Sequence, residues 1–474
     1  MADALFPSRS VIRKLHSIAA CLPCTLLLTG VDVTTVDAND PAVPGPEAVC
    51  PACLGASTLP DDVLREAGES VRASGFTGAD FSLSIRLPIS LQARQRAIML
   101  WLHSENSDYA LQEISTKYLL RARLARAIGE VCQMAAKSDV EADLSVTLAV
   151  EHPESADEYQ FLSAITPAPP GRSYKGRGDM LSRRCDNTHN VLAFLNKASP
   201  QDLRSHNFFP PPAPTTRATL SSVTVARKSR FIAGRYTKYS RNVSNSPFII
   251  NNVKVAPTSV AEQIGLPLQE AYQATDYKFV GSGREDVDVR MLGTGRPFYI
   301  ELVNPRRAHL TPEELDNVRQ TAINSFAPVQ AVGILREIKA HLTAGIKEGE
   351  ENKTKEYACL VWLKDPIAAD EAAAKVRPYQ EGFTVQQKCP VRVMNRRALL
   401  TRPKQIHTLD VKILEPHFAL VTLSTEAGTY IKEFVHSDCG RSSPSLAEIL
   451  GTSADLLELD VVNVDLEWPP AVES

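Results

Sequence analysis

Apolar side chains recur at every second position in two segments of the N-terminal half of the chain, residues 81–87 and 144–150. A two-residue period is typical of a strand that buries one face. Between these segments, apolar residues recur at helical spacing near 91–104 and 109–136, and Asp108 is the expected N-cap of the second helix. This order of elements predicts an α/β module.

The C-terminal half mixes both periods. We expect strands at 287–291, 297–303, 357–363, 407–414, 417–425 and 458–467. We expect helices at 257–272, 311–323, 328–346 and 430–437. Strands that follow one another closely, with helices interspersed, predict an α+β fold with a mixed or antiparallel sheet.

A proline-rich run separates the two halves. Residues 208–214 read Phe-Phe-Pro-Pro-Pro-Ala-Pro, and proline continues neither a helix nor a central strand, so a linker is expected here. We therefore predict three parts: a cysteine-bearing segment at 1–58, an accessory domain at 59–215 and a larger domain at 216–474.

The composition fits a globular protein and says little about its partner. Of the 474 residues, 43% are hydrophobic and 23% are charged, and the formal net charge is −3. Any contact with a nucleic acid must therefore come from local basic patches. The chain has no run of 18 apolar residues, so no membrane span is expected. Separately, we expect the protein to be a monomer.

The expected compartment is the nucleus, the cytoplasm or both. The mitochondrion is the alternative, because the first 30 residues hold several basic residues and a single acid, Asp3.

Four of the nine cysteines form two close pairs, Cys21 with Cys24 and Cys50 with Cys53. Two residues between paired cysteines let both thiolates face one ion, and two such pairs complete the tetrahedral four-thiolate geometry of structural zinc. Chance pairs or redox-active dithiols are the alternatives. Because four thiolates leave no open position for water, the predicted zinc ion is structural and not catalytic.

Two glycine-rich runs look like phosphate loops but lack the residues that such loops need. Asp286 stands where a dinucleotide fingerprint starting at Gly281 requires its third glycine, and the chain has no Gly-Lys-Ser or Gly-Lys-Thr triplet for a P-loop. The other run, residues 293–295, is instead predicted to form a tight hairpin turn between two strands. These features argue against an ATP- or NAD-dependent enzyme.

A group of charged residues is predicted just before this hairpin. On a strand at 287–291, the two-residue period places Asp286, Asp288 and Arg290 on one face. Two acids and a base are unusual for a core face, although a solvated face with cross-strand ion pairs is the alternative. Lys432 would lie in the first turn of a helix, where a cation interacts poorly with the helix dipole, so an anionic partner is expected.

Two basic runs contain no acid. The first, 217–241, holds Arg217, Arg227, Lys228, Arg230, Arg235, Lys238 and Arg241, interleaved with Phe231, Tyr236 and Tyr239. The second, 391–404, holds Arg392, Arg396, Arg397, Arg402 and Lys404. Dense basic residues neutralise phosphates and aromatic rings stack on bases, so both runs are predicted to contact RNA. Solvated surface is the alternative.

These motifs together resemble one enzyme family. The run Gly-Arg-Glu-Asp at 283–286 resembles the Gly-Arg-x-Asp motif of pseudouridine synthases. The run Gly-Thr-Tyr-Ile-Lys at 428–432 resembles their later motif, which supplies an Arg or Lys to the catalytic Asp. The longer stretches 282–302, 346–355 and 428–441 are similar to the archaeal and eukaryotic tRNA pseudouridine synthases of family ten. The likeness spans nearly all of 230–470 and includes the cysteine pairs.

The resemblance implies a fold and a site. The fold is the pseudouridine synthase fold, a central mixed sheet with helices around an active cleft, preceded by a domain with a four-cysteine zinc site and a THUMP module. Asp286 is the implied nucleophile, with Asp288 as its rival, and Lys432 is its implied cationic partner. Tyr357 is the implied active-site tyrosine, for which a core aromatic is the alternative. Catalysis in this family uses no metal or organic cofactor.

The resemblance also implies a substrate. Uridines 54 and 55 in the TΨC loop of tRNA are the expected targets, and other structured RNA is a further expected partner. A non-catalytic RNA-binding or scaffold protein, for example in microRNA precursor processing, is the alternative function. RNA contacts are expected from Arg284, Arg235, Tyr236, Lys238, Tyr239, Arg241, Arg392, Arg396 and Arg397.

The chain departs from the family at one place. Residues 395–398 read Asn-Arg-Arg-Ala, where the family typically has His-Arg-Arg-Pro. The departure leaves the geometry of this loop open while keeping its basic character.

Overall fold

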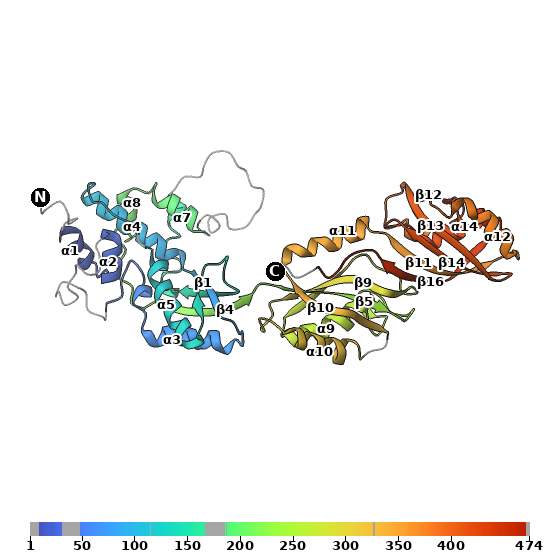
Figure 1. The fold of residues 1–474 in the computed structure, drawn as a ribbon. Coiled ribbons are helices and arrows are strands. Elements are labelled where there is room, and N and C mark those ends of the chain that lie inside the picture. The colour runs from blue at the N-terminus through green and yellow to red at the C-terminus, as the bar shows by residue number, and fades with distance from the viewer. Residues whose placement is uncertain are drawn as a thin grey trace, which may run out of the picture. The chain divides into compact units, whose positions relative to one another are not determined.

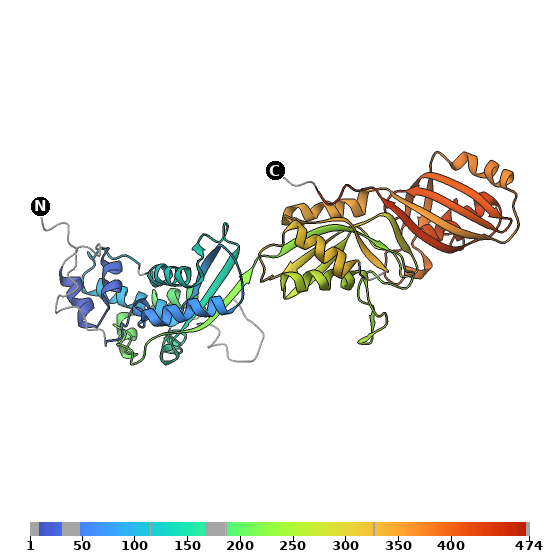
Figure 2. The same ribbon diagram turned by 60° about the horizontal axis from the view of Figure 1, so that its bottom comes forward.

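The computed structural model describes residues 9–30, 48–113, 115–165, 185, 187–325 and 328–470. The chain divides into two compact units, Met1–Ala226 and Arg227–Ser474 (Figures 1 and 2). Most of the spacer between the two cysteine pairs lies outside the described residues.

A four-stranded sheet forms the centre of the first unit. Its order is β2 (Ala135–Ala136), β1 (Asp80–Arg86), β3 (Leu144–Glu151) and β4 (Thr219–Arg227). β1 runs parallel to both β2 and β3. The buried side chains of β1 and β3 share one core with the helices α3 (Asp61–Ala73) and α5 (Thr116–Cys132). The two segments with alternating apolar residues are therefore strands, as predicted.

Further helices complete the described part of the first unit: α1 (Arg9–Ser17), α2 (Leu22–Thr29), η2 (Ala56–Thr58), α4 (Ile89–Glu105), η3 (Pro153–Ser155), α6 (Leu162–Ile165), α7 (Thr188–Leu195) and α8 (Pro200–Ser205). α4 confirms the helix expected near 91–104. The helix expected at 109–136 begins later than predicted, because its N-cap is Ser115 and not Asp108. The preceding segment instead packs against α2, where the Gln112 N–H donates to the Leu28 carbonyl at 2.8 Å.

The proline-rich run 208–214 belongs to the first unit. Phe208 and Phe209 are buried in a core with residues of α4, α6, α7 and α8. After the prolines the chain returns to the first sheet as β4, which lies beside β3. The compact units therefore divide between Ala226 and Arg227, later than the border predicted at 215. The predicted linker is instead a packed segment.

The second unit is built on one large mixed sheet. In the described residues this sheet has ten strands, in the order β10-β5-β9-β16-β11-β14-β13-β12-β15, with β8 also paired to β9. The pair of β9 and β16 is parallel, and the other pairs whose direction is assigned are antiparallel. The predicted α+β class with a mixed sheet is confirmed. The strands are β5 (Arg230–Lys238), β8 (Asp276–Gly281), β9 (Arg290–Val303), β10 (Val329–Ile338), β11 (Lys355–Leu363), β12 (Phe383–Lys388), β13 (Thr401–Glu415), β14 (Phe418–Thr425), β15 (Ser442–Ser443) and β16 (Ala454–Val464).

Helices cover both faces of this sheet. The described helices are α9 (Val260–Tyr272), α10 (Pro312–Val318), η5 (Arg319–Ile323), η6 (Ala340–Thr343), α11 (Ala344–Asn352), α12 (Ala369–Val376), η7 (Arg377–Tyr379), η8 (Val391–Val393), α13 (Ile431–His436) and α14 (Leu446–Leu450). Neighbouring residues of β5 show the two faces. Ile232 joins the core that contains α9 and α10, whereas Ala233 packs with Ile346 of α11. The hairpin of β6 (Ile249–Ile250) and β7 (Val253–Lys254) projects from this body (Figure 2).

Two expectations for the second unit are wrong. The segment predicted as a helix at 328–346 begins as strand β10, because antiparallel pairing with β5 overrides the local helical pattern. The glycines at 293 and 295 do not turn the chain, since β9 runs through both. Both have positive φ, and a Cβ at Gly293 would collide with the Val462 carbonyl oxygen of β16. These glycines therefore allow the neighbouring backbones to approach closely.

Among the described residues, no helix combines the length and apolar character that crossing a membrane requires.

Candidate active site

Asp286 lies in the loop 282–289, which joins β8 to β9. β5 pairs along one edge of β9. On the other edge, β16 pairs with Arg290 and Met291, whereas β8 pairs with residues 298–303. The loop therefore leaves the sheet where these two neighbours of β9 meet. The strand predicted from residue 287 starts only at Arg290, because the preceding residues form a turn in which the Val289 N–H donates to the Asp286 carbonyl at 3.1 Å.

The residue before Asp286 anchors this loop in the protein interior. The Glu285 carboxylate accepts hydrogen bonds from Arg296 Nε at 2.7 Å and from the Tyr236 hydroxyl at 3.0 Å. The side chains of Glu285 and Arg296 are only 1% and 3% exposed, and Tyr236 is fully buried. Burial, reinforced by the charge of Glu285, raises the pKa of Tyr236 well above its ordinary value, so its hydroxyl remains a donor.

Two further buried side chains hold the backbone of the loop. Asn245 Nδ2 donates to the Glu285 carbonyl at 3.0 Å. Lys238 Nζ donates to the carbonyl oxygens of Val243 at 2.8 Å and of Asp286 at 3.0 Å. The main chain is therefore fixed immediately before and at Asp286, while the Asp286 side chain remains 45% exposed.

Asp286 and Asp288 share one cation. Lys432 Nζ lies 2.6 Å from Asp288 Oδ2 and 3.4 Å from Asp286 Oδ2. Burial acts to raise the pKa of Asp288, but the hydrogen bond and the charge of Lys432, with smaller contributions from the backbone and Lys238, together leave this pKa below its ordinary value. Lys432 is in the first turn of α13, as predicted. Two hydrogen bonds of 2.9 Å between the Gln387 side chain and the Tyr430 backbone hold the start of that helix.

A second cation reaches the same carboxylate oxygen. Arg392 Nη1 donates to Asp286 Oδ2 at 3.2 Å, and Arg392 Nε donates to Glu433 Oε1 at 2.7 Å. Both cations thus contact Oδ2 of Asp286, and within the described residues its Oδ1 has no hydrogen-bond partner. Because the side chain is 45% exposed, Oδ1 is available to a ligand.

Tyr357 lies on β11, in a row of paired residues that crosses the sheet. It pairs with Val461 of β16, which pairs in turn with Met291 at the start of β9. Directly paired residues share a face of the sheet, so Tyr357 lies two strands from the beginning of β9 on the face that Met291 buries. Burial raises the pKa of Tyr357 to about 12, although nearby Arg296 acts in the opposite direction. Its ring is therefore uncharged at neutral pH.

Part of the predicted RNA contact in the run 217–241 is wrong. Tyr236 and Lys238 are both completely buried and hydrogen-bonded within the protein, so neither reaches a ligand. Arg235 donates to the carbonyl oxygens of Gly295 and Val464 at 2.8 and 3.0 Å. These residues stabilise the sheet and the loop, because an acid-free sequence run says nothing about which of its side chains point inward.

Arg241 also serves the structure. Its guanidinium forms ion pairs with Asp460 at 2.7 Å and Glu458 at 2.8 Å, and it donates to the Asp288 carbonyl at 3.1 Å. It therefore ties the loop of Asp286 to β16, a role different from the expected RNA contact.

The remaining residues of the predicted RNA surface are exposed. Tyr239 is 47% exposed, and Arg284, Arg396 and Arg397 are exposed as well. Contact of these side chains with RNA stays a prediction.

Three residues that shape the site escaped the sequence reasoning: Asn245, Arg296 and Glu433. Arg296 left a signal, because a charge directly before the apolar strand predicted at 297–303 suggests a buried partner. Glu433 left none, since its partner Arg392 lies 41 residues away in the sequence. Asn245 left none either, although only one of its two partners, Glu285, is 40 residues away, and the other, Tyr236, is nine residues away.

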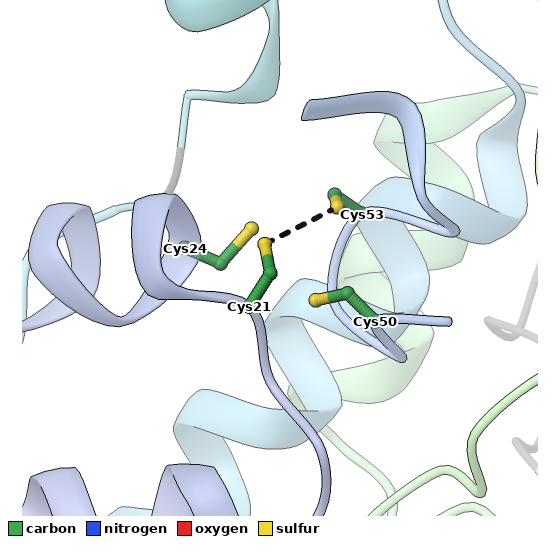
Figure 3. A group of neighbouring side chains, drawn as sticks. All are labelled: Cys21, Cys24, Cys50 and Cys53. Carbon is green, nitrogen blue, oxygen red and sulfur yellow. Dashed lines mark hydrogen bonds between the residues drawn. The ribbon is translucent and has the colours of Figure 1, made fainter. Parts of the chain in front are cut away.

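The four predicted metal ligands meet in the first unit, as Figure 3 shows. The sulfur atoms of Cys21, Cys24, Cys50 and Cys53 all lie within 4.8 Å of one another, and those of Cys21 and Cys53 are 3.8 Å apart. A tetrahedral site with zinc–sulfur bonds of about 2.3 Å requires sulfur atoms about 3.8 Å apart. Hydrogen bonds from the other three thiols hold the pKa of Cys53 well below its ordinary value. The arrangement therefore fits a closed four-thiolate metal site, packed among residues of α1, α2 and α4.

Comparison with known proteins identifies the family. Residues 231–465 match the family model described as Pus10, C-terminal, and residues 50–225 match the model described as Eukaryotic Pus10, N-terminal. The tRNA pseudouridine synthase Pus10 of Homo sapiens is 34% identical over 436 residues, which cover 90% of this chain and 80% of that protein. The protein of the same name from Thermofilum pendens is 33% identical over 241 residues, which cover 50% of this chain and 52% of that protein.

Among solved structures, a chain of a Cbf5-Nop10-Gar1 complex matches 48% of this chain and 57% of its own length, with a TM-score of 0.26 and 16% identity. A similarity this low supports no conclusion about this protein. The two family models and the human relative, by contrast, cover most of the chain. The resemblance inferred from the motifs is thus confirmed, and the chain belongs to the Pus10 family.

Proposed function

We propose that this protein is a tRNA pseudouridine synthase that isomerises uridines 54 and 55 of the TΨC loop, with Asp286 as its nucleophile. The names of the relatives support the reaction class and the tRNA substrate. The observation that carries the residue assignment is the setting of Asp286. It is an exposed carboxylate that directly follows a fully buried ion pair and contacts two cations.

This setting suits a nucleophile. A reacting group must be held in a defined orientation, and contacts from two cations provide such a hold for a carboxylate. Lys432 and Arg392 both contact Oδ2 of Asp286, which leaves Oδ1 to attack the nucleoside. The base then detaches from C1′, rotates and re-attaches through C5, and the bond to Asp286 breaks. The hydrogen on C5 leaves as a proton, and N1, which has lost its bond to C1′, takes up a proton. The same atoms end in a new arrangement, so the step needs no metal or organic cofactor.

Tyr357 is proposed to line the pocket that receives the uracil. A uridine in a folded tRNA loop must be unstacked before Asp286 reaches it, and an aromatic ring compensates for the stacking that is lost. The uncharged ring of Tyr357 and its position two strands from β9 support this role.

The proposal is tested by tritium release from tRNA labelled at C5 of its uridines. The wild-type protein is expected to release tritium and Asp286→Asn is expected to release none. Asp288→Asn is the matched control, because it removes the neighbouring acid that also pairs with Lys432, and it is expected to keep measurable activity.

Two results would contradict the proposal. A wild-type protein inactive on every tRNA would favour the RNA-binding or scaffold alternative. An Asp286→Asn protein as active as wild type would exclude Asp286 as the nucleophile.

We further propose that the cysteine cluster binds Zn²⁺ as a structural ion. The sulfur spacing supports a tetrahedral ion, and four thiolates would leave it no position for substrate. Such an ion would join the start of α2 to the turn at residues 50–53, next to α4.

The remainder of the first unit is proposed to be a THUMP-like accessory domain that contacts tRNA. Its α/β architecture and its match to the N-terminal family model support this role. On the second unit, the exposed residues Arg284, Tyr239, Arg396 and Arg397 are the proposed RNA contacts.

A further inference from the structure

We propose that Arg392 positions the nucleophile, is held for this purpose by Glu433, and does not serve as a phosphate contact. This inference rests on the proposed function, because it assigns a task at the carboxylate of Asp286. It also separates Arg392 from its neighbours Arg396 and Arg397, which belong to the same basic loop.

Four charged side chains form a continuous series of ion pairs, from Lys432 to Asp286, from Asp286 to Arg392 and from Arg392 to Glu433. Lys432 and Glu433 are adjacent in α13 and carry opposite charges. Lys432 contacts Asp286 directly, and Glu433 contacts it through Arg392. Three segments distant in sequence, the loop 282–289, the turn η8 and the helix α13, therefore meet at one carboxylate.

The distances indicate that Arg392 is the main cation that orients the carboxylate of Asp286. Lys432 lies closer to Asp288, at 2.6 Å, than to Asp286, at 3.4 Å. Arg392 contacts Asp286 at 3.2 Å, which is the shorter of the two cation contacts of this carboxylate. Without Arg392, the Oδ2 atom would keep only the longer contact, from a lysine that is better paired elsewhere. The carboxylate would then rotate more freely.

The burial of Glu433 indicates that Arg392 acts within the protein and not as a contact for phosphate. The side chain of Glu433 is only 4% exposed, and its second oxygen, Oε2, is buried and has no hydrogen-bond partner in the part of the chain that the structure describes. A buried carboxylate oxygen without a hydrogen-bond partner lowers the stability of the folded protein. The position of Glu433 is therefore poorly explained by stability alone. The partner of its other oxygen is Arg392, which it holds at 2.7 Å. An acid buried in this way makes no contact with phosphate, and the arginine that it binds is already committed to two carboxylates.

The backbone of the turn that carries Arg392 is fixed as well. The Val391 N–H donates to Asp438 Oδ2 at 3.2 Å, and Arg441 Nη2 donates to the Cys389 carbonyl at 2.7 Å. Both anchors lie just after α13, the helix that supplies Lys432 and Glu433. The side chain of Arg392 therefore reaches Asp286 along a defined path.

The test measures two quantities for each variant: the single-turnover rate at saturating tRNA and the Kd for tRNA. Arg392→Ala and Glu433→Gln are each expected to lower the rate about 100-fold, as a misplaced reacting group does, with Kd changed less than about twofold. The double variant is expected to be no slower than either single variant, because both break the same contact. Arg392→Lys is expected to recover part of the rate, since one ammonium bridges two carboxylates less well than a guanidinium.

Two further variants provide comparison. Arg396→Ala removes a proposed phosphate contact and is expected to raise Kd and to reduce the salt dependence of log Kd by about 0.7–0.9. Lys412→Ala removes an exposed lysine of β13, a strand that carries none of the four ion-paired residues. It is expected to have the single-turnover rate and the Kd of wild type.

The outcomes separate this inference from the proposed function. An inactive wild-type protein would overturn the proposed function and this inference with it. An active wild type, together with an Arg392→Ala variant that raises Kd and leaves the saturated rate intact, would overturn this inference alone. A Glu433→Gln variant with the wild-type rate would also overturn it, because Glu433 has no route to the substrate except through Arg392.

Discussion

Arg296 Nε lies 2.7 Å from Glu285 Oε2 inside the second unit, immediately next to the loop that carries Asp286. Both side chains are almost completely removed from solvent. Arg296→Met would leave the charge of Glu285 buried and unpaired, and we expect it to lower the free energy of unfolding by about 3–5 kcal/mol. Denaturation in urea, followed by the transition of the second unit, measures this loss.

The double variant Arg296→Met with Glu285→Gln is the control for that experiment. Because it removes both charges, we expect it to recover part of the stability lost in Arg296→Met. A double variant as unstable as Arg296→Met would show that lost packing, and not an unpaired charge, causes the loss.

Replacing Lys432, unlike replacing Arg296, should reduce activity and have little effect on stability. Its partners Asp286 and Asp288 are 45% and 65% exposed, so solvent screens the pairing. We expect Lys432→Gln to lower the rate of tritium release strongly while it changes the free energy of unfolding by only about 0–1 kcal/mol. Activity and urea denaturation are measured on the same preparation. A loss of several kcal/mol would mean that Lys432 is mainly a structural residue.

Lys355 provides a test at alkaline pH. Burial, with a contribution from Arg296, lowers its pKa to about 8, below the ordinary value of a lysine. Between pH 8 and about 10.4 the unfolded chain binds a proton at Lys355 that the folded protein does not bind, so stability rises with pH in this window. The full rise is on the order of 3 kcal/mol, at about 1.4 kcal/mol for each unit by which the pKa is lowered.

Comparison with Lys355→Met isolates this effect from other groups that titrate at alkaline pH. We expect the free energy of unfolding to rise more for wild type than for the variant as the pH rises from 8 to about 10.4. The measurement is urea denaturation of both proteins at several pH values. Parallel curves for the two proteins would exclude a lowered pKa at Lys355.

Metal analysis tests the cysteine cluster. We expect about one zinc ion for each chain, and we expect Cys50→Ser to lose it and to unfold its first unit at a lower temperature. Cys439→Ser is the control, because Cys439 is exposed and lies outside the cluster. A wild-type protein that is free of metal when purified and equally stable with added zinc would contradict the proposed ion.

Local patterns in the sequence were reliable where a feature depends on neighbouring residues. The alternating segments became β1 and β3, and Lys432 lies in the first turn of its helix. The cysteine spacing predicted a cluster whose sulfur atoms do meet. The motif at 283–286 was sufficient to indicate a pseudouridine synthase, and the longer stretches 282–302, 346–355 and 428–441 indicated the family, because the residues of each stretch are adjacent in the chain.

Features that depend on distant partners could not be predicted in the same way. Tyr236 and Lys238 belong to a basic, aromatic run that suggests a surface, yet both are buried. The glycines at 293 and 295 suggest a turn, yet they lie within a long strand with close neighbours. In both cases the order of strands in the sheet decides whether a side chain is buried and how closely another backbone approaches.

By itself, the sequence determined the family, the class of fold and the identity of Asp286 as the residue to examine. Only the tertiary structure decided that Glu285 and Arg296 anchor its loop, and that Arg392, held by Glu433, contacts its carboxylate. The reason is physical. Periodicity and motifs report the conformation of short segments, whereas burial and ion pairing depend on which segments the sheet brings together.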